Sequence, residues 1–186
     1  MSPQAELVGG ERLLAYGEGL RQVYADAFAQ PPWGADEAMA EAYMERLAVD
    51  VTRPGFVAAL ARDGARVLGF ATAWTTPDPF PADRGYPLAA AALGPERTGS
   101  WLCGAREVDE LAVRTRARGL GLGAGLLRLV TDAAEDGRCW LLTSVRARST
   151  VRFYRRMGWR QVDRPAPESG DVTVFLGPRH PAVLTF

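Results

Sequence analysis

The chain has 186 residues, and its 22 basic side chains, all arginine, balance 22 acidic ones. This length allows one domain with a sizeable core, while a hydrophobic content of 47% excludes a disordered chain and zero net charge argues against a nucleic-acid partner. Because no apolar run reaches the length of a membrane span and the first residues lack a signal-peptide pattern, we expect a cytoplasmic protein with no membrane partner.

The first half of the chain predicts a strand, two helices and a hairpin. In order, these are a short strand within residues 5–13, a helix over 14–29, a helix from Asp36 to about residue 51, and strands over 55–62 and 66–75. The Gln30-Pro31-Pro32-Trp33-Gly34 segment breaks the first helix, and Asp36 is a suitable N-cap for the second. Asp63-Gly64 is a typical hairpin turn.

The second half alternates strands and helices after a long connection. In order, it predicts a connection over residues 76–100 with a short helix near 87–93, a strand over 101–113, a helix over 121–136, a strand over 139–145, a helix over 149–157, and paired strands over 159–164 and 171–176. A connection of this length is functional or mobile. Residues 177–186 give no pattern. The whole reads as one mixed α/β domain without repeats.

The segment Arg118-Gly-Leu-Gly121-Leu-Gly123-Ala124 is the most informative stretch, because a predicted strand precedes it and a predicted helix follows it. A strand that leads through a glycine-rich turn into a helix directs bare backbone N–H groups and the positive end of the helix at one point. That arrangement binds phosphate, and side-chain Cβ atoms would hold the phosphate away from the backbone. We therefore expect a phosphorylated cofactor at this turn.

Two familiar phosphate-binding motifs fit poorly here. The loop of ATPases requires a lysine, and the chain contains none. A dinucleotide fingerprint can be placed on Gly119-x-Gly121-x-x-Ala124, but it requires an acidic residue about 20 positions later, at the end of the next strand. That strand ends in Leu-Thr-Ser-Val-Arg146 instead, and more than half the chain precedes the motif.

A third motif fits without a gap. Arg118, Gly121 and Gly123, placed after the strand that ends at Val113, resemble the acyl-CoA signature of the GNAT acetyltransferase superfamily. Phe153-Tyr154-x-x-x-Gly158-Trp159 is similar to the same family's later signature, although Ala147 stands where the family often has asparagine. The order and the spacing of the two motifs, with a strand between them, strengthen the resemblance.

This resemblance implies a single GNAT-like domain over residues 1–186. Its fold would be a mostly antiparallel sheet of about six or seven strands with about four flanking helices, in which the fourth and fifth strands run parallel and splay apart around acetyl-CoA. The cofactor-binding residues it implies are Leu111, Ala112 and Val113 on the strand and Arg118, Gly119, Leu120, Gly121, Leu122, Gly123 and Ala124 in the turn.

The resemblance also suggests catalytic groups for acetyl transfer to an amine, which needs an acid for the departing sulfur and a base for the amine. Tyr154 lands on the family's frequent general acid, although it also suits a core aromatic on an amphipathic helix. Glu107 and Glu110 are candidate bases, with ordered water as the alternative. Alternation along the strand places Glu107 and Asp109 on one face and Glu110 on the other.

The acceptor is expected to bind between the first helices and the final hairpin, over residues 28–45 and 164–171. Trp33, Asp36 and Glu37, with Glu41, would supply an aromatic wall and acidic groups for a cationic amine. They equally suit a core plug, a helix cap and solvated helix positions. The predicted activity is N-acetylation of a small-molecule amine, and the alternatives are acetylation of protein N-termini or lysines and non-catalytic acyl-CoA binding.

Charge and cysteine content add three expectations. Residues 101–186 hold 14 arginines and 9 acids, so the half with the glycine turn is positive and suits a phosphorylated cofactor, although most of these arginines equally suit a solvated surface. Cys103 and Cys139, with His180 as the one histidine, lack metal-ligand spacing, so we expect reduced thiols and no metal. The family resemblance, in which members often pair, adds the expectation of a homodimer.

Overall fold

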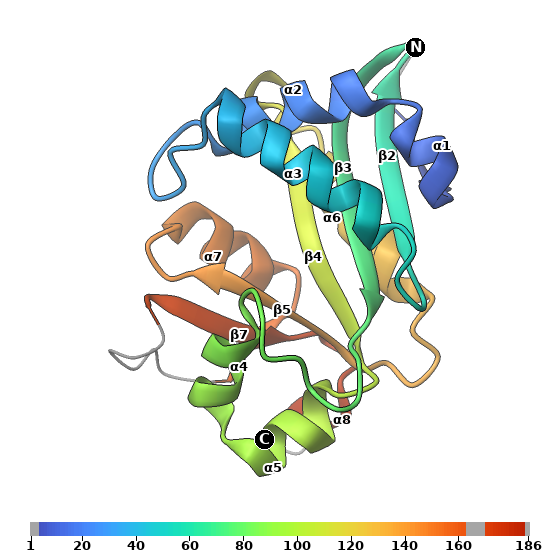
Figure 1. Cartoon of the computed structure of the whole chain (residues 1–186). Helices are drawn as coiled ribbons and strands as arrows, with labels where there is room; N and C mark the ends of the chain where they lie inside the picture. Colours follow the sequence, from blue (N-terminus) through green and yellow to red (C-terminus); the bar gives the residue numbers. More distant parts are fainter. Residues whose placement is uncertain (1–3, 163–169, 185–186) are drawn as a thin grey trace. The chain divides into compact units, whose positions relative to one another are not determined.

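A computed structural model describes residues 4–162 and 170–184 of the chain (Figure 1). Its seven described strands are hydrogen-bonded in the order β1-β2-β3-β4-β5-β7-β6. They are β1 (Gln4–Val8), β2 (Val57–Asp63), β3 (Arg66–Thr75), β4 (Arg106–Val113), β5 (Cys139–Ser144), β6 (Arg160–Gln161) and β7 (Val172–Leu176). Strands β4 and β5 are parallel, whereas β1–β2, β2–β3, β5–β7 and β6–β7 are antiparallel. This confirms the predicted mixed fold with its parallel fourth and fifth strands.

Eight α-helices lie in the described part of the chain, whereas the sequence pattern predicted five and the family resemblance implied about four. They are α1 (Gly10–Leu14), α2 (Gly17–Phe28), α3 (Glu37–Asp50), α4 (Tyr86–Leu93), α5 (Pro95–Arg97), α6 (Leu122–Asp132), α7 (Arg148–Arg156) and α8 (Pro181–Leu184). The expectation missed α1, α5 and α8 because helices of three to five residues are too short to show a helical period. None of the described helices is long and apolar enough to cross a membrane.

The chain divides into two compact units, which we describe separately. The first unit comprises Met1–Trp74 and Asp109–Ala133, and the second comprises Thr75–Val108 and Ala134–Phe186. The assignment of residues 1–186 to one domain remains a prediction.

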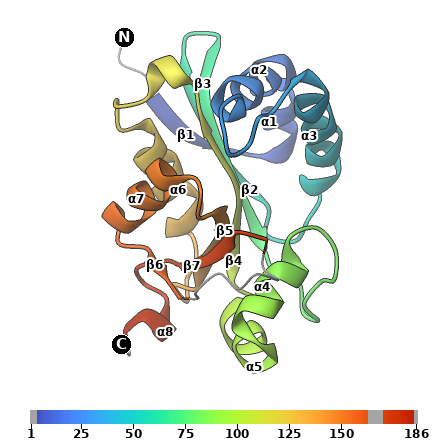
Figure 2. The same ribbon diagram turned by 90° about the vertical axis from the view of Figure 1, so that its left-hand side faces the viewer.

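In the first unit, helices cover both faces of a β-hairpin. Strands β2 and β3 pair from Val57↔Ala73 to Asp63↔Arg66, and Gly64, at φ +57°, makes the predicted turn. Figure 2 shows α2 and α3 on one side of these strands and α6 on the other. Because both faces are covered, β2 and β3 consist of nearly continuous apolar residues. The core on the α2–α3 side contains Leu20, Val23, Tyr43, Leu47, Leu60, Phe70 and Ala112.

In the second unit, β5 and β7 alternate their side chains between two helices. Trp140 pairs with Leu176, and both pack in the core beneath α4. Phe175 points the other way and contacts Tyr154 of α7, with ring centroids 5.8 Å apart. The period of two along each strand therefore fixes which residues meet α4 and which meet α7.

The strand predicted over residues 101–113 begins only at Arg106. Residues Thr98–Leu102 form a π-helical turn instead, in which the Cys103 N–H donates to the Thr98 carbonyl. Leu102 is fully buried in the core beneath α4, and Gly104, at φ +73°, redirects the chain into β4. The apolar residues Trp101 and Leu102 therefore pack from a helical turn, and the prediction that they belong to the strand is wrong.

The last antiparallel pair is shorter than predicted. Strand β6 covers only Arg160–Gln161, which pairs with Phe175 and Leu176 of β7. Residues 163 and 164 of the predicted strand lie outside the described residues.

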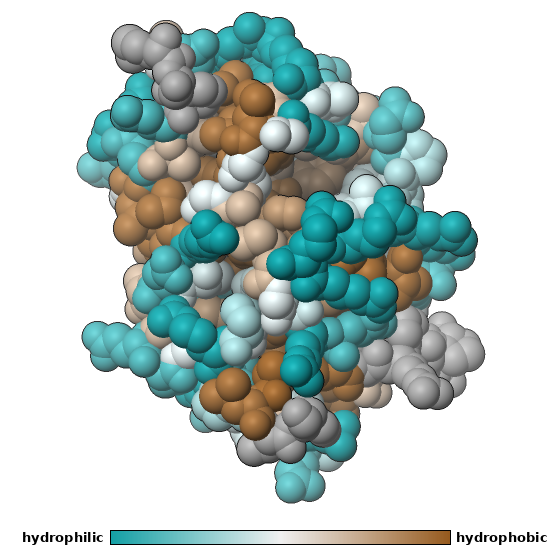
Figure 3. Space-filling view, turned by 180° about the vertical axis from the view of Figure 1, so that it is seen from behind, coloured by the Kyte–Doolittle hydropathy of each residue, from teal (hydrophilic) through white to brown (hydrophobic). Residues whose placement is uncertain are grey.

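Large apolar side chains that reach the surface are scattered in the described chain. They are Leu7, Trp33, Met39, Val49, Leu120 and Leu184, which belong to five separate segments, with Met39 and Val49 near opposite ends of α3. Figure 3 likewise shows hydrophobic residues in separate patches among hydrophilic ones on the face that it presents. Scattered exposed apolar residues are normal and need no binding partner to explain them.

Candidate active site

The predicted phosphate turn lies in the first unit, between the end of β4 and the start of α6. Gly119 and Gly121 adopt φ values of +82° and +77°, which favour glycine, and Gly121 is the left-handed N-cap of α6. A Cβ added to either glycine would meet nothing within 4 Å in the described structure. No described side chain caps α6, so its first-turn N–H groups and the positive end of its dipole face this open space.

Hydrogen bonds fix this turn against the end of α2. The Thr115 N–H donates to Asp26 Oδ2 at 2.6 Å, and Arg118 Nη2 donates to the Ala27 carbonyl at 2.9 Å. Arg118 therefore uses its guanidinium on the C-terminal end of a helix, where a cation is favourable. We therefore expect Arg118 to contribute to cofactor binding through its backbone N–H group and by holding the turn in place.

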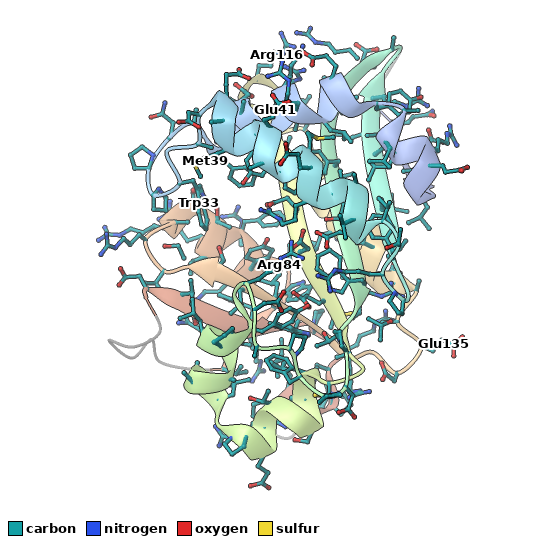
Figure 4. All side chains as sticks on the ribbon, in the orientation of Figure 1. Trp33, Met39, Glu41, Arg84, Arg116 and Glu135 are labelled. Carbon is teal, nitrogen blue, oxygen red and sulfur yellow. The ribbon has the colours of Figure 1, made fainter. Side chains whose placement is uncertain are left out.

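Two neighbouring arginines differ in how they are used. Arg114 donates from Nε to the Val67 carbonyl at 2.8 Å and from Nη2 to Gln22 Oε1 at 3.0 Å. Arg116 is exposed, as Figure 4 shows, and its guanidinium has no hydrogen bond or ion pair to the described residues. The Arg116 guanidinium is therefore available to a ligand.

The strand that leads to the turn packs unusually close to β3. A Cβ on Gly69 of β3 would lie 2.8 Å from the Ala112 carbonyl oxygen, so only glycine allows this approach. The Arg114 N–H donates to the Leu68 carbonyl at 2.8 Å. Ala112 is buried, whereas Leu111 and Val113 are half-buried. These contacts position the three predicted backbone-binding residues of β4.

Glu110 lies near two tyrosines of the helical layer in the first unit. Tyr24 and Tyr43 stack with their ring centroids 4.4 Å apart. Burial raises the pKa of both hydroxyls, and the negative charge of Glu110 raises it further. Asp109 acts on both tyrosines in the same direction. These shifts place the Glu110 carboxylate within electrostatic reach of α2 and α3.

Glu107, in the second unit, has a defined partner that the sequence did not indicate. The Tyr86 hydroxyl, at the start of α4, donates to Glu107 Oε2 at 2.6 Å. Glu107 is half-buried, and its β5 neighbour in the ladder is Trp140. The Gly85-Tyr86-Pro87 sequence signals a helix start, but nothing in it indicates that the hydroxyl reaches β4.

Tyr154 has the packing of a core aromatic. It is 6% exposed, and its ring lies 5.3 Å from Phe153, 6.0 Å from Trp159 and 5.8 Å from Phe175. The packing fixes the direction of the ring, which an acid also requires. Its role as general acid remains a prediction.

The predicted acceptor residues are in the first unit and divide by role. Asp36 Oδ1 accepts the Met39 N–H at 2.9 Å, which confirms the helix cap. Glu37 is exposed and pairs with Arg21 of α2. Trp33 is 39% exposed and meets Phe28 edge-on, so its interpretation as a core plug is wrong. Figure 4 shows Trp33 in the connection between α2 and α3, with Met39 and Glu41 along α3.

Two further expectations concern segments and ligands. The second acceptor wall, residues 164–171, lies mostly outside the described residues. Within residues 4–162 and 170–184, no three or more His, Cys, Asp or Glu side chains form a group that could hold a metal ion.

The fold and the turn define an α/β protein with a mixed sheet and a strand–glycine turn–helix suited to an anionic ligand. A family model described as "Acetyltransferase (GNAT) family" matches residues 20–159, and the chain belongs to this family. This confirms the resemblance found in the two sequence motifs. A search of curated proteins finds no match.

Solved structures share this fold at low sequence identity. Crystal structures of PH1933 from Pyrococcus horikoshii OT3 and of the PaiA N-acetyltransferase from Thermoplasma acidophilum with coenzyme A match at TM-scores of 0.65 and 0.59 and identities of 13% and 15%. They cover 94% and 95% of this chain and 98% and 99% of their own. A Corynebacterium glutamicum structure titled "histone acetyltransferase HPA2 and related acetyltransferase" matches at 0.62 and 19%, covering 95% of each chain.

Proposed function

We propose that this chain is an acetyl-CoA-dependent N-acetyltransferase that moves an acetyl group directly to a primary amine of a small molecule. The observation that carries the proposal is the open turn at Gly119 and Gly121, at the uncapped start of an eleven-residue helix. Membership in the GNAT family supports acyl transfer, and the PaiA neighbour was crystallised with coenzyme A.

The residues of the turn fit the pyrophosphate of coenzyme A. Backbone N–H groups from Arg118 to Ala124 would hold it, because the glycines leave open the space that a Cβ would fill. The exposed Arg116 supplies a nearby positive charge. The backbone N–H groups of Leu111, Ala112 and Val113 would bind the pantetheine amides and the acetyl carbonyl oxygen. Bound acetyl-CoA supplies the acetyl group as a thioester.

The side chains supply the general base and the general acid. Glu107 or Glu110, directly or through ordered water, takes a proton from the amine, whose nitrogen forms a bond to the acetyl carbon while the carbon–sulfur bond breaks. Tyr154 gives its hydroxyl proton to the leaving sulfur. The backbone N–H groups of β4 stabilise the negative charge on the carbonyl oxygen as the bond forms. The products are an N-acetyl amine and a free thiol.

Calorimetric titration of the full chain with acetyl-CoA, with NAD as the control ligand, tests the cofactor assignment. We expect acetyl-CoA to bind and NAD not to bind. A response to NAD alone would overturn the proposal.

A panel of small-molecule amines, N-terminal peptides and lysine peptides, assayed for released thiol, then tests the acceptor class. Turnover with small amines supports the proposal. Turnover with peptides alone would replace it with protein acetylation, and binding without turnover on any acceptor would indicate a non-catalytic acyl-CoA-binding protein.

A further inference from the structure

The Tyr86 hydroxyl holds the Glu107 carboxylate within the second unit. It donates to Glu107 Oε2 at 2.6 Å, a short distance of the kind expected when the acceptor is charged. The two residues are 21 positions apart in the sequence and come from α4 and β4. The bond therefore depends on how α4 is held, and aromatic packing holds it.

An aromatic cluster fixes the Tyr86 ring. Tyr86 is 2% exposed, and its ring centroid lies 5.1 Å from Phe80, edge-on, and 6.2 Å from Trp140. Trp140 is itself held by its indole N–H, which donates to Thr76 Oγ1 at 2.7 Å. Since Trp140 is the β5 neighbour of Glu107 in the parallel ladder, the ring packing and the strand register both place the hydroxyl at this carboxylate.

We infer that Tyr86 is a positioning residue for Glu107 and that Glu107 acts as the base of the proposed reaction. This inference rests on the proposed N-acetyltransferase function. A general base must be ionised before it accepts a proton and must keep one orientation toward the amine. A hydroxyl donor on Oε2 favours the ionised carboxylate and restricts its rotation, and a carboxylate has further lone pairs to accept the amine proton.

The step balances in protons. Glu107 takes one proton from the attacking nitrogen, and Tyr154 gives one to the sulfur. Solvent then returns both side chains to their starting states. Tyr86 keeps its own proton throughout, because it acts on the reaction only through Glu107.

The test is a cycle of Tyr86→Phe, Glu107→Gln and the double variant in the full chain, assayed for amine acetylation across pH. Phenylalanine keeps the ring packing and removes only the hydroxyl. We expect Tyr86→Phe to lower kcat/KM for the amine about tenfold and Glu107→Gln about a hundredfold. The acid limb of the pH profile of kcat/KM should move to higher pH in Tyr86→Phe. The kcat/KM of the double variant should equal that of Glu107→Gln. Tyr16→Phe, a ring outside this cluster, is the matched control and should behave as the parent.

Several outcomes would overturn the inference while leaving N-acetylation intact. These are parental rates and an unchanged acid limb in Tyr86→Phe, parental rates in Glu107→Gln, or a Tyr86→Phe loss that persists in full on the Glu107→Gln background. If the parent acetylates no amine, the proposed function fails instead.

A second readout does not require turnover. Carbon-13 NMR of labelled glutamate carboxyls, assigned with Glu107→Gln, should show Glu107 titrating at higher pH in Tyr86→Phe than in the parent. An unchanged titration would overturn the inference by itself.

Discussion

Replacing Gly121 with alanine isolates the open space at the start of α6. Gly121 has φ +77° and ψ −1°, the left-handed conformation, and an added Cβ would meet nothing within 4 Å. The methyl group therefore costs only backbone strain in the free protein, on the order of 1 kcal/mol. For a chain of this length that corresponds to a fall in Tm of roughly 2–4 °C, so the variant stays folded.

Binding should suffer far more than stability. If the methyl occupies the phosphate position and costs one amide hydrogen bond to a charged group, about 1.5–3 kcal/mol is lost. That corresponds to a roughly 10- to 100-fold rise in Kd for coenzyme A. Gly125→Ala is the matched control, because Gly125 lies in the same helix and its added Cβ would make only an ordinary contact, 4.0 Å from Ala5 of β1. It should raise stability by roughly 0.5–1 kcal/mol and leave Kd unchanged.

Calorimetric titration with coenzyme A, after thermal unfolding of each variant, measures both effects. Equal affinities for Gly121→Ala and Gly125→Ala would refute the assignment of the turn to the pyrophosphate. A Gly121→Ala variant that binds weakly yet unfolds near the parental temperature would support it.

Three further predictions test single residues. Tyr154→Phe should lower turnover at least about tenfold with unchanged coenzyme A affinity, and parental turnover would remove the acid role. Asp36→Ala should cost about 1 kcal/mol of unfolding free energy in urea, because it deletes the cap of α3; unchanged stability would contradict the capping role. His180 is buried; its Nε2 is hydrogen-bonded to the Trp101 carbonyl and its Nδ1 accepts the Ala182 N–H. Burial lowers the pKa of His180. Its contribution to stability should be complete above the unfolded value of about 6.5 and fall as pH drops through the lowered folded pKa, so His180→Gln should flatten urea unfolding measured between pH 7.5 and 5; an equally steep loss would contradict this.

Local signals predicted the elements that local chemistry decides. The Asp63-Gly64 turn set the hairpin, and Asp36 set the start of α3, since a turn and a cap depend on residues within a few positions. The glycine turn was predictable for the same reason, because its conformations follow from glycine itself.

Contacts between distant segments could not be predicted. Arg118 was predicted as a cofactor-binding residue of the turn, but nothing local indicated that its guanidinium donates to the Ala27 carbonyl, 91 residues earlier at the end of α2. The hydrogen bond of Tyr86 could not be predicted because its acceptor, Glu107, lies on a strand 21 residues later. Trp101 and Leu102 read as strand because a short apolar run suits a strand and a helical turn equally.

The most direct test of N-acetyl transfer follows the acetyl group itself. The full chain is incubated with acetyl-CoA carrying carbon-13 in the acetyl carbonyl and with a panel of small amines, and labelled amide and free thiol are quantified together. The proposal predicts that at least one amine yields labelled amide and thiol in equal amounts, at a rate proportional to enzyme. Thiol release without labelled amide, or no reaction on any acceptor despite tight acetyl-CoA binding, would contradict it.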